Sequence, residues 1–121
     1  MEYFKDKLDS KIKIFLLGFS QGAALSAGAG LYLKSKIDGV ISIAGFIRED
    51  SIKLMGIKPN NDYSPLLIMH GNKDEIVPIE SGIELKNICS ELGQEVEFIT
   101  YDENHKIPVS AMKIIRNFIL K

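Results

Sequence analysis

Four short apolar runs, separated by segments of helical character, limit what this chain can fold into. The runs occupy residues 13–17, 39–43, 66–69 and 96–101. Continuous apolar runs of this length are typical of strands that are buried on both faces, as in parallel sheets. Their alternation with helices predicts a layered α/β fold with about four parallel strands flanked by helices.

The segments between these runs carry helix signals. Residues 2–9 have the pattern of the last turns of an amphipathic helix, and residues 21–34 predict a helix rich in alanine and glycine. Residues 78–92 predict a further helix, because apolar residues recur there at positions i, i+3, i+4 and i+7. Pro108 is expected at the first position of a final helix. Residues 45–64 are expected to form an irregular link.

An uncharged stretch at residues 14–33 is long enough to cross a bilayer. However, Ser20, Gln21 and four glycines interrupt it, and such a run would weaken a continuous helix. We interpret the stretch as a strand followed by a buried helix, so stable membrane insertion is not expected. The first seven residues mix both charges, and no signal peptide is expected.

Composition narrows the function classes. The 121 residues carry 15 basic and 16 acidic side chains, which predicts one globular domain, 1–121, without the positive field that attracts nucleic acids. Cys89 is the only cysteine and no Cys/His cluster occurs, so neither a disulfide nor a metal site is expected. Cys89 falls on an apolar helix face and is expected to be a core thiol. A reducing, cytoplasmic setting is the simplest expectation.

The first strand leads into Gly18-Phe19-Ser20-Gln21-Gly22, a G-x-S-x-G pattern between a strand and a helix. In this context the pattern predicts a nucleophile elbow, a sharp turn that exposes the serine hydroxyl. Glycines are expected at both flanking positions because the turn leaves no room for larger side chains. The backbone N–H of Gln21 is a candidate oxyanion donor. The plainer interpretation is a Gly/Ser turn that closes a strand.

Two further candidates follow other strands. Asp74 lies after the third strand, where a carboxylate can hold an imidazole in one tautomer, and Glu75 competes for that role. Asp74 is otherwise an ordinary turn residue. His105 follows the fourth strand as a candidate general base. His70, at the end of the third strand, is expected to be a hydrogen-bonded structural residue.

The order of these residues strengthens the hypothesis. Ser20, Asp74 and His105 each follow a strand of one predicted parallel sheet, and ligands bind beyond the carboxyl ends of such strands. Serine, then acid, then histidine is the order found in α/β-hydrolases. The sequence therefore predicts a Ser-His-Asp catalytic site.

Three segments carry a family resemblance. Residues 14–23, with Gly18-Phe19-Ser20-Gln21-Gly22-Ala23, resemble the elbow of the acyl-protein thioesterase and carboxylesterase/phospholipase family of α/β-hydrolases. Residues 65–78 resemble that family's P-x-L-x-x-H-G-x-x-D-x-x-V-P segment, and residues 104–107 resemble its G-H-x-I segment. The resemblance implies hydrolysis of an acyl ester or thioester through an acyl-enzyme on Ser20, with Asp74 orienting His105 and no metal or organic cofactor.

Two departures qualify the resemblance. Asn104 replaces the usual glycine, and asparagine tolerates a left-handed backbone well. The resemblance also covers only about the C-terminal half of a family member, so the strands before residue 1 are expected to be missing. One of them precedes the loop that supplies the second oxyanion donor, and losing such a donor costs on the order of 10²–10³ in turnover.

A half-fold has consequences for partners. The first strand would expose an unpaired edge, through which the chain is expected to associate with itself or with a missing N-terminal half. The alternative function is a non-catalytic or split-gene fragment that is inactive or needs that second chain. A peptidase or a dienelactone-type hydrolase is less favoured, because the latter carries cysteine at the elbow. Residues 45–64 and the missing half are expected to shape the acyl pocket.

Overall fold

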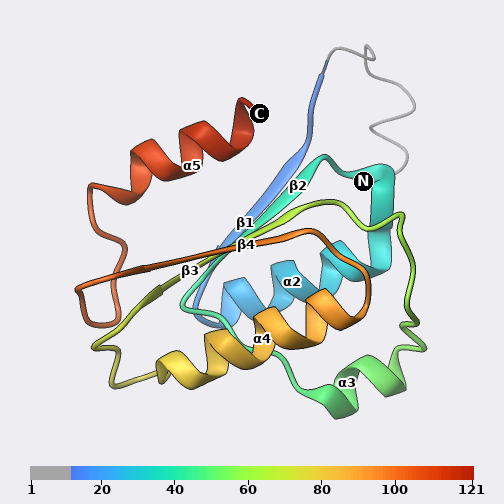
Figure 1. Ribbon diagram of the computed structural model, residues 1–121, viewed down its shortest axis with the longest axis horizontal. Helices are drawn as coiled ribbons and strands as arrows, with labels where there is room; N and C mark the ends of the chain where they lie inside the picture. Colours follow the sequence, from blue (N-terminus) through green and yellow to red (C-terminus); the bar gives the residue numbers. More distant parts are fainter. Residues whose placement is uncertain (1–11) are drawn as a thin grey trace.

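The structure is a computed structural model that describes residues 12–121; the helix predicted at residues 2–9 lies outside them. Strands and helices alternate along the chain (Figure 1). In order, they are β1 Phe15–Phe19, α2 Gln21–Leu33, the 3₁₀ turn η1 Lys34–Lys36, β2 Gly39–Ile43, α3 Glu49–Leu54, β3 Leu66–Gly71, α4 Ile79–Glu91, β4 Val96–Tyr101 and α5 Ala111–Ile119.

The four strands form one sheet in the order β1-β2-β3-β4, and every neighbouring pair is parallel. This confirms the predicted α/β class. Because the strands run in one direction, the segments that follow β1, β3 and β4 all leave the sheet at the carboxyl ends of the strands. The register pairs Gly18 of β1 with Ser42 of β2, and Gly71 of β3 with Tyr101 of β4.

Helices cover both faces of the sheet. Helices α2, α3 and α4 lie on one face, and α5 lies on the other (Figure 1). The first core layer includes Leu31, Ile52 and Leu85, one from each of these three helices. The second includes Ile115 and Phe118 of α5. This two-sided packing explains why the central strands are almost entirely apolar.

Burial differs between the inner and the outer strands. Every residue of β2 and β3 is buried, as the apolar runs predict. The outer strands β1 and β4 are only partly buried, and the side chain of Leu17 is 51% exposed. The prediction of two-sided burial is therefore wrong for β1, which has a neighbouring strand on one side only among the described residues. The run that forms β4 is interrupted by Glu97 and Thr100, and it predicts a strand without two-sided burial.

Several predicted boundaries need correction. Strand β1 begins at Phe15 and includes two residues assigned to the turn, and β3 continues through His70 to Gly71. The segment predicted as irregular contains α3. The last helix begins at Ala111 and not at Pro108, because Ala111 N–H and Met112 N–H bond three residues back and form a tighter turn there.

The uncharged stretch at residues 14–33 divides into β1, the elbow turn and α2, as interpreted from its glycines and polar residues. Within residues 12–121 no helix combines the length and the hydrophobicity that a membrane span requires.

Candidate active site

Ser20 occupies the turn between β1 and α2 in a strained backbone conformation. Its φ is 58° and its ψ is −117°, a region that residues with a Cβ rarely adopt. The turn is held from both sides: Ser20 N–H donates to Ile43 O at 2.9 Å, and Ser20 O accepts from the N–H groups of Ala23 and Ala24. Strain of about 1–3 kcal/mol persists because β2 and α2 together fix this turn.

The two elbow glycines have different roles. A Cβ on Gly18 would collide with the carbonyl group of Gly22, so the tight turn requires glycine at position 18. A Cβ on Gly22 would meet no described atom within 4 Å. The expectation that both positions exclude side chains is therefore correct for Gly18. It is wrong for Gly22, where a Cβ would point into open space.

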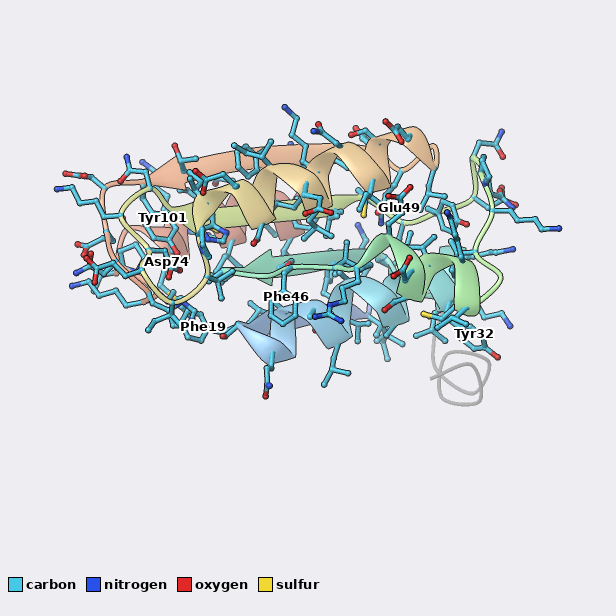
Figure 2. The ribbon with its side chains drawn as sticks, turned by 90° about the horizontal axis from the view of Figure 1, so that it is seen from below. Phe19, Tyr32, Phe46, Glu49, Asp74 and Tyr101 are labelled. Atoms are coloured by element: carbon cyan, nitrogen blue, oxygen red, sulfur yellow. The ribbon has the colours of Figure 1, made fainter. Side chains whose placement is uncertain are left out.

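The structure brings the three predicted site residues together. Ser20 Oγ lies 3.0 Å from His105 Nε2, and His105 Nδ1 lies 2.7 Å from Asp74 Oδ2. Asp74 comes from the β3–α4 loop and His105 from the β4–α5 loop. Figure 2 shows Asp74, Phe19 and Tyr101 at one end of the sheet. Phe19 directly precedes Ser20 in the sequence. Residues 85 positions apart in sequence thus form one hydrogen-bonded chain.

The two oxygens of the Asp74 carboxylate have separate partners. Oδ1 accepts from Ile76 N–H at 2.9 Å and from Val77 N–H at 2.8 Å, while Oδ2 faces His105. Asp74 is therefore the turn residue of the plainer interpretation and also the partner of the imidazole. Glu75, the competing carboxylate, is exposed, and the carboxylate that contacts His105 is that of Asp74.

The electrostatics of Asp74 favour its charged form. Burial by itself raises the pKa of this carboxyl group. The hydrogen bond from His105 and those from the Val77 and Ile76 amides outweigh burial and hold the pKa below its ordinary value. An ionised carboxylate accepts only, so His105 Nδ1 carries the hydrogen and Nε2 is free to accept the Ser20 proton.

The loop that carries His105 is fixed by contacts that sequence reasoning missed. The ring centroid of Phe19 lies 4.7 Å from that of His105. A Cβ on Gly71 would collide with the carbonyl oxygens of Glu103 and Asn104, so glycine allows the loop to pass close to β3. The pattern gave only one signal for these roles, namely that Phe19 and Gly71 fall inside the motifs that resemble a known family.

Tyr101 braces the same loop from the end of β4. Its hydroxyl donates to Lys106 O at 2.9 Å. Burial, together with the nearby charges of Asp74 and Glu103, raises the pKa of Tyr101 to about 12, so the hydroxyl keeps its proton. Asn104 does not use the left-handed backbone that asparagine tolerates, because it is not among the described residues with positive φ. The loop turns without that conformation.

Two residues set aside during sequence analysis lie where they were expected. His70 is fully buried, and its Nε2 lies 2.7 Å from Val77 O. Cys89 is fully buried in α4, and burial raises the pKa of its thiol to about 12. A thiol in that state is a poor nucleophile.

The remaining features concern the oxyanion and the acyl group. The Gln21 N–H is the first amide of α2 and has no carbonyl partner within the helix. Beside α2, an apolar groove of about 480 Å³ lies between that helix and residues 46–55, with Leu25, Phe46 and Met55 among its lining residues. Figure 2 shows Phe46 next to α2. The described residues contain no group of three side chains able to hold a metal ion.

The chain is similar in sequence to known proteins along nearly its whole length. Residues 3–121 match the family described as phospholipase/carboxylesterase. The chain is 34% identical to acyl-protein thioesterase 1 of Saccharomyces cerevisiae over 97% of its own length and 54% of that protein. It is 27% identical to acyl-protein thioesterase 1 of Neurospora crassa, over 97% of the chain and 52% of that protein. The chain thus spans about half the length of the curated relatives it matches.

Solved structures give the same result for the fold. The crystal structure of Arabidopsis thaliana SOBER1 superposes with a TM-score of 0.79 at 27% identity, covering 97% of this chain and 58% of the other. The acyl-protein thioesterase 2 of Zea mays gives the same TM-score at 19% identity, which supports the fold alone. The alternation of strands and helices found here is therefore part of a larger α/β-hydrolase fold.

Proposed function

Because this chain belongs to the phospholipase/carboxylesterase family, we propose that it carries the catalytic residues of a serine hydrolase acting on carboxylic esters or thioesters. The observation that supports this most directly is the continuous contact from Ser20 Oγ through His105 to Asp74. Ser20 is the nucleophile, His105 the general base, and Asp74 the residue that orients and stabilises the imidazole.

In the proposed mechanism, Ser20 Oγ attacks the acyl carbonyl carbon while its proton moves to His105 Nε2. The carbonyl oxygen becomes negative, and the Gln21 N–H at the start of α2 donates to it. His105 then gives its proton to the departing alkoxide or thiolate, leaving the acyl group on Ser20. A water molecule then attacks the acyl carbon while His105 takes its proton, and the acid leaves when the bond to Ser20 Oγ breaks and His105 returns the proton to that oxygen.

The Asp74 carboxylate serves this mechanism through charge. When His105 accepts a proton, its positive ring lies 2.7 Å from Oδ2. Asp74 is stable as an anion at neutral pH because two backbone amides already bind its other oxygen. The carboxylate is therefore already in place when His105 becomes positively charged, and the loop does not need to rearrange.

For the substrate, we assign the acyl part to the apolar groove beside α2. Ala24, which lines the groove, lies one helical turn from Ser20. The walls of this groove are almost entirely apolar and suit an aliphatic chain better than a polar one. The relatives named acyl-protein thioesterase 1 agree with an acyl substrate.

A second proposal concerns the exposed surface of β1 and α2. Strand β1 has no neighbour on its outer side among the described residues, and Leu17, Leu25 and Tyr32 are 51%, 75% and 71% exposed. Edges of this kind pair with further strands. Because the chain spans half of its relatives, we propose that a segment equivalent to their other half covers this surface, in the same or in a separate polypeptide.

A fluorophosphonate probe tests both statements. The expected result is one probe added per chain at Ser20, none in Ser20→Ala, and full labelling in Ser26→Ala, a control elsewhere on α2. Labelling is measured by intact mass, with and without a co-expressed polypeptide covering the unmatched part of the yeast relative. Labelling only with that polypeptide supports completion by a second segment. A folded chain that stays unlabelled under both conditions would show the catalytic proposal to be wrong.

A further inference from the structure

His70 is a buried polar residue that the proposed mechanism does not use. It lies in β3, its side chain is fully buried, and its Nε2 is 2.7 Å from Val77 O. A carbonyl oxygen can only accept, so Nε2 carries the hydrogen and donates it. The other nitrogen, Nδ1, is then unprotonated, and no described atom is its hydrogen-bond partner.

Val77 connects His70 to the carboxylate of the site. Its carbonyl group accepts from His70, while its own N–H donates to Asp74 Oδ1 at 2.8 Å. Ile76 N–H donates to the same oxygen. The turn of residues 74–77 is therefore held at one end by the Asp74 carboxylate and at the other by the His70 imidazole.

His70 also faces the oxygen that the mechanism uses. Its Nε2 lies 3.6 Å from Asp74 Oδ2, the atom that contacts His105, and both side chains are shielded from solvent. At this separation the His70 N–H donates to Val77 O and not to Oδ2, so Oδ2 keeps its short contact with His105.

We propose that His70 is a positioning residue for Asp74. By holding the Val77 carbonyl, it keeps the Ile76 and Val77 amides on Oδ1, and Oδ2 is left for His105. The role in catalysis rests on the proposed function, but the positioning can be measured without any reaction. Without the donor at position 70, the Val77 peptide loses its anchor, and the carboxylate is free to rotate away from His105.

The helix packed against His70 offers an independent way to disturb it. A Cβ on Gly82 of α4 would lie 2.7 Å from His70 Nδ1, closer than real contacts allow. Gly82→Ala therefore displaces the imidazole while His70 itself is unchanged. Ser90→Ala is the matched control, because Ser90 is an exposed residue of the same helix.

The first test is the protonation pattern of the two histidines in the whole chain, measured by nitrogen-15 NMR of the rings. The chain contains two histidines, so each ring can be assigned by comparison with a single variant. We expect His70 with hydrogen on Nε2, and His105 with hydrogen on Nδ1 and a low-field proton signal. A His70 ring with hydrogen on Nδ1 and none on Nε2 overturns the proposal, because it cannot donate to Val77.

The second test compares two substitutions of His70. His70→Met fills the space without a donor, whereas His70→Gln places an amide N–H at the same distance along the side chain. We expect His70→Met and Gly82→Ala to shift the low-field His105 proton and to slow probe labelling of Ser20 by about 10- to 100-fold, the range that small misplacements produce. His70→Gln and Ser90→Ala are expected to stay within about threefold of the parent chain.

The outcomes separate this proposal from the proposed function. A parent chain that is never labelled contradicts the hydrolase, while the His105 signal still reports on His70. An unchanged His105 signal in both His70→Met and Gly82→Ala overturns the positioning role even if labelling occurs. Equal loss in His70→Gln and His70→Met also overturns it, because the donor is then irrelevant. If His70→Met fails to fold, Gly82→Ala and the ring nitrogen pattern decide.

Discussion

At the scale of single residues, the site combines strain with compensating bonds. Ser20 adopts a backbone conformation suited to glycine, and it is held there by Ile43 on one side and α2 on the other. Asp74 is buried, yet it is stabilised as an anion by two amides and an imidazole. Both residues are costly in isolation and depend on their neighbours.

The strain at Ser20 predicts that two small substitutions differ in their free energy of unfolding. Ser20→Gly relieves the positive φ and is expected to raise the free energy of unfolding by about 1 kcal/mol relative to Ser20→Ala, which keeps the Cβ. Both variants lose probe labelling. Urea unfolding followed by circular dichroism measures the difference, and equal stability of the two variants would contradict the strain.

The lowered pKa of Asp74 predicts acid sensitivity. Because the folded pKa lies below the ordinary value of 3.8, ionised Asp74 stabilises the fold above that value, and the contribution is lost as pH falls through the folded pKa. Asp74→Asn is expected to cost about 2 kcal/mol at pH 7, and the gap from the parent chain should narrow below about pH 4.

The measurement is urea unfolding between pH 7 and pH 2. Asp102→Asn is the matched control, since the ion pair of Asp102 with Lys73 is exposed and such pairs contribute little. A gap for Asp74→Asn that stays constant with pH would contradict the lowered pKa.

At the scale of elements, the strands were readable and the loops were not. The apolar runs located all four strands, and the two inner strands are apolar because helices cover both of their faces. Helix α3 escaped prediction because six residues with one buried side chain, Ile52, give no periodic pattern. The order of Ser20, Asp74 and His105 indicated which residues meet. The supports from Phe19 and Gly71 could not be read, because they depend on how the loop that follows β4 approaches β1 and β3.

Gly71 provides a prediction at this scale. Gly71→Ala places a methyl group against the Glu103 and Asn104 carbonyls, so the loop that carries His105 must move. We expect a loss of about 1–3 kcal/mol in stability and at least tenfold slower labelling of Ser20. Unfolding and labelling are compared with Ser90→Ala, a substitution at an exposed position of α4. An unchanged labelling rate in Gly71→Ala would show that the loop tolerates displacement.

At the scale of the whole molecule, we expect the outer side of β1 to govern self-association. Among the described residues β1 pairs with β2 alone, and an edge with an exposed Leu17 resembles those that natural sheets protect with charge. We expect Leu17→Lys to reduce self-association of the isolated chain, measured by sedimentation velocity. Leu54→Lys on α3 is the control, since Leu54 is 88% exposed but lies away from the edge. Equal effects of both substitutions would assign association to general hydrophobicity.

The sheet order has a consequence for how such hydrolases diversify. The side chains of the proposed proton relay follow β1, β3 and β4, so all of them lie within residues 12–121. A genetic exchange that replaced everything upstream of β1 would leave the relay intact while presenting it to a different neighbour. The proposed relay can thus be inherited as one block, with its joint to the rest of the fold at the outer edge of β1.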